Sequence, residues 1–117
     1  MYYTITEKKL VSVIFNYLDN QKFINAKRIP DLNDIYFVNS DDGIKEVQII
    51  YRPSEKECLI YFGLVSNIMS FFSLEKLKVE EIIGGWVEQK LQMKVSRTNL
   101  LANIEVNPKY YIFSNEI

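Results

Sequence analysis

The sequence contains no histidine and only one cysteine, Cys58. Without histidine, the chain cannot build a Ser-His-Asp or Cys-His catalytic centre, nor a zinc site that uses imidazole ligands. One cysteine forms no intramolecular disulfide, which excludes a disulfide-stabilised extracellular scaffold. Because Cys58 lies within an apolar run, we expect it to be a buried small side chain rather than a reactive thiol.

The chain also lacks a hydrophobic run of membrane-spanning length. The longest apolar stretch, residues 58–72, is too short for a bilayer and is interrupted by Ser66, Asn67 and Ser70. The first residues show no signal-peptide pattern. The formal net charge of −1 gives no general attraction to nucleic acid or anionic lipid. We therefore expect a soluble, cytoplasmic protein with no membrane partner.

Alanine, glycine, proline and arginine are scarce, whereas isoleucine, asparagine, lysine, tyrosine and phenylalanine are abundant. The scarce residues have GC-rich codons and the abundant ones have AT-rich codons. The composition therefore predicts an AT-rich genome, and we expect a low-GC bacterium or a phage as the source.

The most regular pattern in the chain covers Ser73–Met93. Apolar residues recur there with the spacing of one helical face: Val79, Ile82, Ile83, Trp86, Val87 and Leu91. Ser73 is the expected N-cap, because its hydroxyl can accept from the first backbone donors of a helix. The only tryptophan, Trp86, lies in the middle of this apolar stripe. We therefore expect this helix to close the core.

Further segments have clear helix or strand patterns. Helical spacing predicts a helix over residues 5–20 and a short helix over 64–72, for which a strand continued to residue 69 is the alternative. Runs of β-branched and aromatic residues between turn residues predict strands at residues 35–38, 47–51, 58–62 and 110–113. The first three form an antiparallel meander and the last pairs at a sheet edge. The chain 1–117 should thus fold as one globular α+β domain.

Two segments have weaker patterns. Residues 21–33 are expected to form a loop with at most a short edge strand, because Pro30 excludes a central strand. Lys27 and Arg28 could contact an anion there, but a solvated loop is favoured. After Met93 the chain is expected to fray through residues 96–99, and an ordered connection after that point is indicated by Leu100, Leu101, Ile104 and Val106.

The predicted meander carries apolar side chains on both of its faces. Two amphipathic helices would cover one face, and neither segment 64–72 nor segment 96–107 is clearly large enough for the other. An open apolar face usually marks a contact surface. We therefore expect a homodimer, unless residues 96–107 cover the sheet. The candidate interface residues are the tyrosines Tyr36, Tyr51 and Tyr61, or the helix line Leu77, Gly84 and Leu91.

A glycine pair, Gly84 and Gly85, interrupts the predicted main helix. Each glycine inside a helix costs about 1 kcal/mol relative to alanine. Either another backbone approaches closely at this point, from the same chain or another copy, or the helix kinks there. We favour close packing.

The densest group of potential cation ligands contains the acidic residues Asp31, Asp34, Asp41, Asp42 and Glu46. It lacks the glycine and terminal glutamate of an EF-hand, so turn and cap roles are favoured. The sequence has no glycine-rich phosphate loop, and its spacing singles out no catalytic carboxylate pair. We expect no catalytic residues, no metal and no cofactor.

The sequence as a whole favours a non-catalytic protein-interaction or structural module that associates with itself. Two alternatives stay open. One is a single-stranded nucleic-acid binder that stacks bases on tyrosines of the sheet, which a salt-dependent gel shift would reveal. The other is a small ligand-binding domain or carboxylate-dependent enzyme, which a deep pocket with convergent polar groups would favour.

Overall fold

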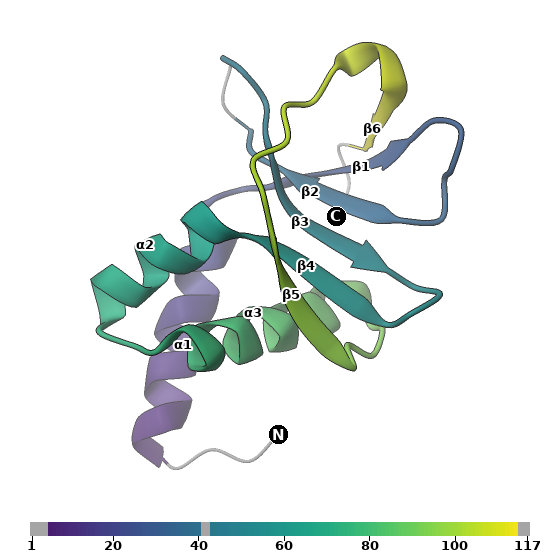
Figure 1. Ribbon diagram of the computed structural model, residues 1–117. Coiled ribbons are helices and arrows are strands. Elements are labelled where there is room, and N and C mark those ends of the chain that lie inside the picture. Colours follow the sequence, from purple (N-terminus) through teal and green to yellow (C-terminus); the bar gives the residue numbers. More distant parts are fainter. Residues whose placement is uncertain (1–4, 41–42, 115–117) are drawn as a thin grey trace.

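The computed structural model describes residues 5–40 and 43–114. Three helices pack against one face of a six-stranded mixed sheet, and an extended segment crosses the other face (Figure 1). The strand order is β5-β4-β3-β2-β1-β6. The elements in chain order are α1 (Ile5–Asn20), β1 (Ile24–Arg28), β2 (Ile35–Val38), β3 (Val47–Arg52), β4 (Glu57–Tyr61), α2 (Phe62–Phe72), α3 (Lys76–Leu91), β5 (Arg97–Leu101), the 3-10 turn η1 (Pro108–Tyr110) and β6 (Tyr111–Ser114).

The α+β class is confirmed, and so is the central meander. β2 pairs with β3 and β3 with β4, both antiparallel. The helices predicted over residues 5–20 and 64–72 are present as α1 and α2, and the last strand lies at a sheet edge as β6. The prediction of three strands and one edge strand nevertheless understates the sheet, because β1 and β5 were missed.

Residues 24–28, which were expected in a loop with at most a short edge strand, form the interior strand β1 between β2 and β6. The loop prediction is wrong because Pro30 lies beyond the end of β1, where its missing N–H removes no hydrogen bond from the strand. Ala26 is buried, whereas Lys27 and Arg28 are exposed. Successive residues of a strand point to opposite faces, so Lys27 and Arg28 do not form a joint anion site.

Residues 97–101, which were expected in a connection, form β5 parallel to β4. Parallel strands need a long crossover between them, and here α2 and α3 supply it. The strand was missed because Arg97, Thr98 and Asn99 carry none of the apolar alternation that predicts a strand.

The boundary between α2 and α3 also differs from the prediction. Ser73 does not cap the main helix: it ends α2 in the left-handed conformation, with φ 53° and ψ 51°, and its N–H donates to the Met69 carbonyl. The main helix α3 begins at Lys76, and the preceding Glu75 makes no side-chain capping bond.

Trp86 lies in the core between the helices and the sheet, as predicted, with 3% of its surface exposed. Its ring packs against Phe23 and Phe37, with centroid distances of 6.0 and 5.5 Å. The indole N–H donates to Asp19 at 3.0 Å. Asp19 also pairs with Lys90 at 2.7 Å, and the hydrogen bond from Lys90 holds the pKa of the Asp19 carboxyl below its ordinary value.

The other face of the sheet is covered by residues 102–110, which run from one sheet edge to the other (Figure 1). Val106 is buried in this segment. The Val106 N–H donates to the Lys45 carbonyl at 2.8 Å, and the Val47 N–H donates to the Ile104 carbonyl at 2.9 Å. This cover removes the open apolar face from which the homodimer was inferred. The homodimer itself stays a prediction.

Candidate functional site

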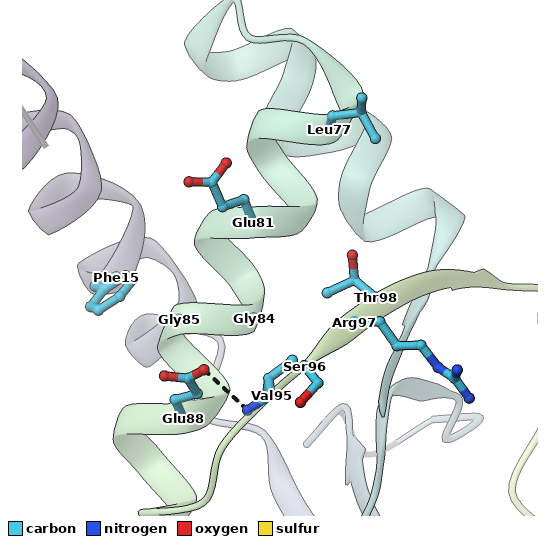
Figure 2. A pocket seen from close by; sticks show the side chains of 10 residues that line it. All are labelled: Phe15, Leu77, Glu81, Gly84, Gly85, Glu88, Val95, Ser96, Arg97 and Thr98. Atoms are coloured by element: carbon cyan, nitrogen blue, oxygen red, sulfur yellow. Dashed lines mark hydrogen bonds between the residues drawn. The ribbon is translucent and has the colours of Figure 1, made fainter. Parts of the chain in front are cut away.

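A groove of about 570 Å³ lies between α3 and β5 (Figure 2). Its floor is the glycine pair of α3, and its walls come from α1, α3 and the chain that enters β5. The lining residues are Phe15, Leu77, Glu81, Gly84, Gly85, Glu88, Val95, Ser96, Arg97 and Thr98.

The segment that returns the chain from α3 to β5 is fixed by hydrogen bonds. Gln92 ends α3 in the left-handed conformation, with φ 56°, and its N–H donates to the Glu88 carbonyl. The Glu88 carboxylate accepts the Val95 N–H at 3.0 Å (Figure 2). The Tyr51 hydroxyl donates to the Lys94 carbonyl at 2.6 Å. These contacts hold one wall of the groove in a defined position.

The two glycines of the floor have different surroundings. A Cβ on Gly84 would lie 3.3 Å from Thr98 Cγ2 and 3.5 Å from Val95 Cγ1. Close approach by the same chain therefore accounts for Gly84. A Cβ on Gly85 would meet only Phe15, at an ordinary contact distance of 3.8 Å. The described fold thus leaves room for a side chain at position 85.

Two carboxylates, Glu81 and Glu88, border the glycine floor about two helical turns apart (Figure 2). The lysines of α3 pair with other acids: Lys76 with Glu80 at 3.4 Å, Lys78 with Glu7 at 2.9 Å and Lys90 with Asp19 at 2.7 Å. Within residues 5–40 and 43–114, neither Glu81 nor Glu88 forms an ion pair. The groove therefore carries uncompensated negative charge.

Among the described residues, Arg97 is the only cation that lines the groove, and it already pairs with two carboxylates. Its guanidinium lies 3.3 Å from Glu57 and 3.6 Å from Glu55. Glu57 is only 6% exposed and also accepts a hydrogen bond from Asn99. Arg52 completes this network at 3.8 Å from Glu57. The sequence pattern did not reveal the network, because its members come from three strands.

The helix line that was predicted as an interface divides between two places. Leu77 and Gly84 both line the α3–β5 groove, and Leu77 is 76% exposed. Leu91 is half-buried against the helix-side core and lines a different hollow, described below. An interface role for these three residues stays a prediction.

The three predicted interface tyrosines do not share one surface. Tyr36 packs edge-to-face on Tyr111, with a centroid distance of 5.3 Å, on the face that residues 102–110 cover. Tyr51 is buried in the helix-side core, and burial raises the pKa of its hydroxyl. Tyr61 is half-buried beside Phe62. The fold therefore does not present them together as a stacking platform.

A second hollow, of about 330 Å³, adjoins the edge strand β6 on the helix side of the sheet. It is more apolar than the α3–β5 groove. The lining residues are Asn25, Ala26, Lys27, Leu32, Ile35, Leu91, Ile112, Phe113 and Ser114. Leu32 and Ile112 are 46% and 54% exposed, so the hollow is open to solvent.

The acidic residues considered as cation ligands have structural roles where they are described. Asp31 accepts the Asn33 N–H at 3.0 Å, which is a turn contact. Burial raises the pKa of the Asp34 carboxyl. Asp41 and Asp42 lie outside the described residues. Among the residues that the structure describes, no group of three or more His, Cys, Asp or Glu is placed to hold a metal ion.

Cys58 is fully buried, as the sequence predicted. Burial raises the pKa of its thiol to about 12, with a smaller contribution from the nearby Glu57 carboxylate. Since the thiolate is the nucleophilic form of cysteine, this side chain is inert at neutral pH.

The chain is similar in sequence to Protein TIC 214 of at least two plants. No family model matches the chain, and no solved structure is significantly similar to it. Protein TIC 214 of Nymphaea alba is 27% identical over 121 residues, which cover 95% of this chain and 6% of that protein. Protein TIC 214 of Cucumis sativus is 31% identical over 80 residues, which cover 68% of this chain and 4% of that protein. The chain thus spans a small fraction of these relatives.

These matches overturn two expectations. The relatives are plant proteins, so the expected bacterial or phage origin is wrong. Their name places those proteins in the TIC translocon of the chloroplast inner envelope, so the expected cytoplasmic location is wrong as well. Codon bias indicates base composition, which a bacterium and a plant organelle can share.

The TIC 214 similarity also bears on the partners. A translocon component works with other proteins, which agrees with the expectation of a protein partner. In the described part of the chain, no helix is long and apolar enough to cross a membrane.

Proposed function

We propose that this chain is a protein-binding domain of a larger TIC 214-like protein, and that the α3–β5 groove receives the partner. The similarity to Protein TIC 214 over most of the chain supports a role in a protein assembly. The geometry supports the groove as the contact surface.

The observation that carries this proposal is Gly85. A glycine in the middle of a helix costs about 1 kcal/mol, and the described fold has room for a side chain there. Gly84 is accounted for by Thr98 of the same chain, but Gly85 is not. A partner that packs directly on the helix backbone would account for the missing side chain.

The partner that fits best is a different polypeptide with basic side chains. Glu81 and Glu88 leave the groove negatively charged, and a like-charged second copy of the groove would be repelled from it. The open sheet face that suggested a homodimer is covered by residues 102–110. Static light scattering tests this choice, because the chain alone should scatter as a monomer of 13.8 kDa.

Site-specific photo-crosslinking tests the groove itself. A benzophenone side chain is placed at Leu77, which is 76% exposed at one end of the groove, and in a matched variant at Ile44, which is 67% exposed elsewhere. We expect a cross-linked partner from position 77 that is absent from position 44. Gly85→Ala should reduce the yield, whereas Gly43→Ala, where nothing lies within 4 Å of the added Cβ, should not. The same products from both positions would contradict the proposal.

We also propose that the domain is not an enzyme. The only thiol is buried, with a pKa of about 12, and the sequence has no histidine to act as a general base at neutral pH. Of the two groove carboxylates, Glu88 already accepts a backbone hydrogen bond from Val95. We therefore assign Glu81 and Glu88 a role in binding the partner rather than in catalysis.

A further inference from the structure

The open edge of β6 has backbone groups in position to pair with another strand. The Ile29 N–H donates to the Tyr110 carbonyl at 2.7 Å, and the ladder continues with Lys27 opposite Ile112. Hydrogen-bonded pairs alternate along an antiparallel ladder, so Tyr111 and Phe113 direct their main-chain groups away from β1. The Tyr111 N–H donates to Pro108. This leaves the Tyr111 carbonyl and both polar groups of the Phe113 backbone facing outward.

These outward groups have no main-chain partner within residues 5–40 and 43–114. An exposed strand edge of this kind is a template for pairing with another chain. Two further features decide what sort of chain fits.

The first feature is the apolar hollow beside the edge. Ile112 points to the helix side of the sheet, where the hollow also has Leu32, Ile35 and Leu91 in its walls. A strand added next to β6 would direct every second side chain toward that face. The hollow has a volume of about 330 Å³, so apolar side chains of the added strand fit into it.

The second feature is positive charge along the same edge. Lys27 lines the hollow, Arg28 follows it in β1 on the opposite face of the sheet, and Lys109 belongs to the turn η1 that directly precedes β6. None of the three forms an ion pair with a described residue. The charges around the edge therefore favour a segment with acidic side chains.

We infer that β6 accepts an extended, acidic polypeptide segment as a seventh strand, with apolar side chains in the hollow beside Ile112. The segment binds through main-chain hydrogen bonds to Tyr111 and Phe113, and its acidic residues approach Lys27 on one face of the sheet and Arg28 on the other. This site lies apart from the α3–β5 groove, where the uncompensated charge is negative. It extends the proposed function but does not depend on it.

A defined peptide tests strand addition in solution. The probe is a blocked seven-residue peptide in which valine alternates with threonine between two aspartates. Titration into the isotope-labelled chain should shift the backbone amide signals of residues 111–114. The same peptide with N-methylated amides on the side that faces β6 cannot donate, so its dissociation constant should rise at least about tenfold.

Variants of the protein provide an independent test. Phe113→Pro removes the outward N–H but no bond to β1, so the fold should persist, as checked by circular dichroism, while peptide binding falls. Lys27→Glu should weaken binding of the peptide with aspartates and strengthen binding of a peptide that carries lysines at the same positions. The photo-crosslink from Leu77 should be unaffected, which separates this site from the groove.

Three outcomes would overturn the inference. Equal dissociation constants for the N-methylated and unmodified peptides would show that the edge binds peptides by charge alone, without strand pairing. Amide shifts confined to residues 84–98 would place the peptide in the groove instead. Unchanged spectra up to millimolar peptide would likewise exclude a site on β6.

Discussion

The two edge strands of the sheet, β5 and β6, have different side-chain environments. At one edge, β5 carries Arg97 and Asn99, and both are bound to the buried carboxylate of Glu57. At the other edge, β6 presents the exposed Ile112 beside an apolar hollow, and the neighbouring cations are not paired with described acids. The side chains of the β5 edge are thus paired within the domain, whereas the β6 edge has unpaired cations and an open apolar hollow that a partner could contact.

This difference shows how one sheet can resist and accept additional strands. Charged side chains on an edge strand disfavour pairing with another chain. The Glu57 network places such charges on β5 and also fixes that strand against β4. β6 has no comparable network among the described residues. Four experiments test whether the two edges differ in this way.

Removing the core that supports both edges should have the largest effect. Trp86→Ala deletes a buried ring that contacts Phe23 and Phe37, and it should lower the free energy of unfolding by about 3–5 kcal/mol. Urea unfolding followed by circular dichroism gives the value. Trp86→Phe keeps most of the ring volume and should lower the free energy of unfolding by less than Trp86→Ala does. If the alanine variant melted close to the wild-type temperature, Trp86 would not be a core residue.

Breaking the charge network should loosen only the β5 edge. Glu57→Ala removes the carboxylate shared by Arg97 and Asn99, and it should cost about 2 kcal/mol, the scale of hydrogen bonds to charged groups. Glu55→Ala removes the more exposed acid of the same network and should cost less than about 1 kcal/mol.

Hydrogen exchange locates that effect. In Glu57→Ala, amides of residues 97–101 should exchange faster, while those of residues 111–114 keep their wild-type rates. Equal acceleration at both edges would mean that the network stabilises the whole domain rather than β5.

The two glycines of α3 should respond unequally to alanine. Gly85→Ala should raise the free energy of unfolding by about 1 kcal/mol, because it improves helix propensity and meets only Phe15 at 3.8 Å. Gly84→Ala should gain less, because its methyl group would lie 3.3 Å from Thr98. Thermal melts of the two variants make the comparison. An equal or larger gain for Gly84→Ala would show that β5 yields easily at this point.

Cys58 provides a direct sensor of the β5 edge, and its native reactivity should be the smallest signal. It lies on β4 opposite Thr98, and the buried thiol has a pKa of about 12. At pH 8 the folded protein should react with a thiol reagent only when β5 opens or the chain unfolds. Below this pKa the thiolate fraction rises about tenfold per pH unit, so the native labelling rate should rise steadily with pH from a very low value. Rapid labelling of the wild-type protein at pH 8 would contradict burial.

The same sensor separates the two edges. Glu57→Ala should accelerate labelling of Cys58, since it releases β5 from β4. Phe113→Pro acts at β6 and should leave the labelling rate at the wild-type value.

The parts of the fold that the sequence predicted have local patterns. The helical repeat around Trp86 and the turn-separated strands of the meander need no knowledge of distant residues. β1 and β5 were missed because each is short, partly polar and defined by a partner far away in the chain: β6 for one, β4 for the other. Residues 96–107 were considered as a cover for the sheet, but the area that they could cover could not be judged from the pattern, and the segment that covers it is 102–110.

The candidate site was predictable only in part. Gly84 and Gly85 were noticed because a helix disfavours glycine, and that signal does indicate a groove. The sequence could not show that Thr98 accounts for one glycine and not for the other. The buried carboxylates Glu57 and Glu80 were missed, because their partners on other elements become neighbours only in the folded chain.

The strand order also sets an order of assembly. β2, β3 and β4 are neighbours in sequence and can pair early, whereas β5 must wait for two helices and β6 must find β1 from the far end of the chain. Until residues 97–114 dock, both sides of the early sheet end in unpaired strands, and the apolar side chains of Val38 and Ile50 lack their cover. Such intermediates aggregate readily. We expect a chain cut after residue 96 to collect in insoluble material, although every residue of the meander is present.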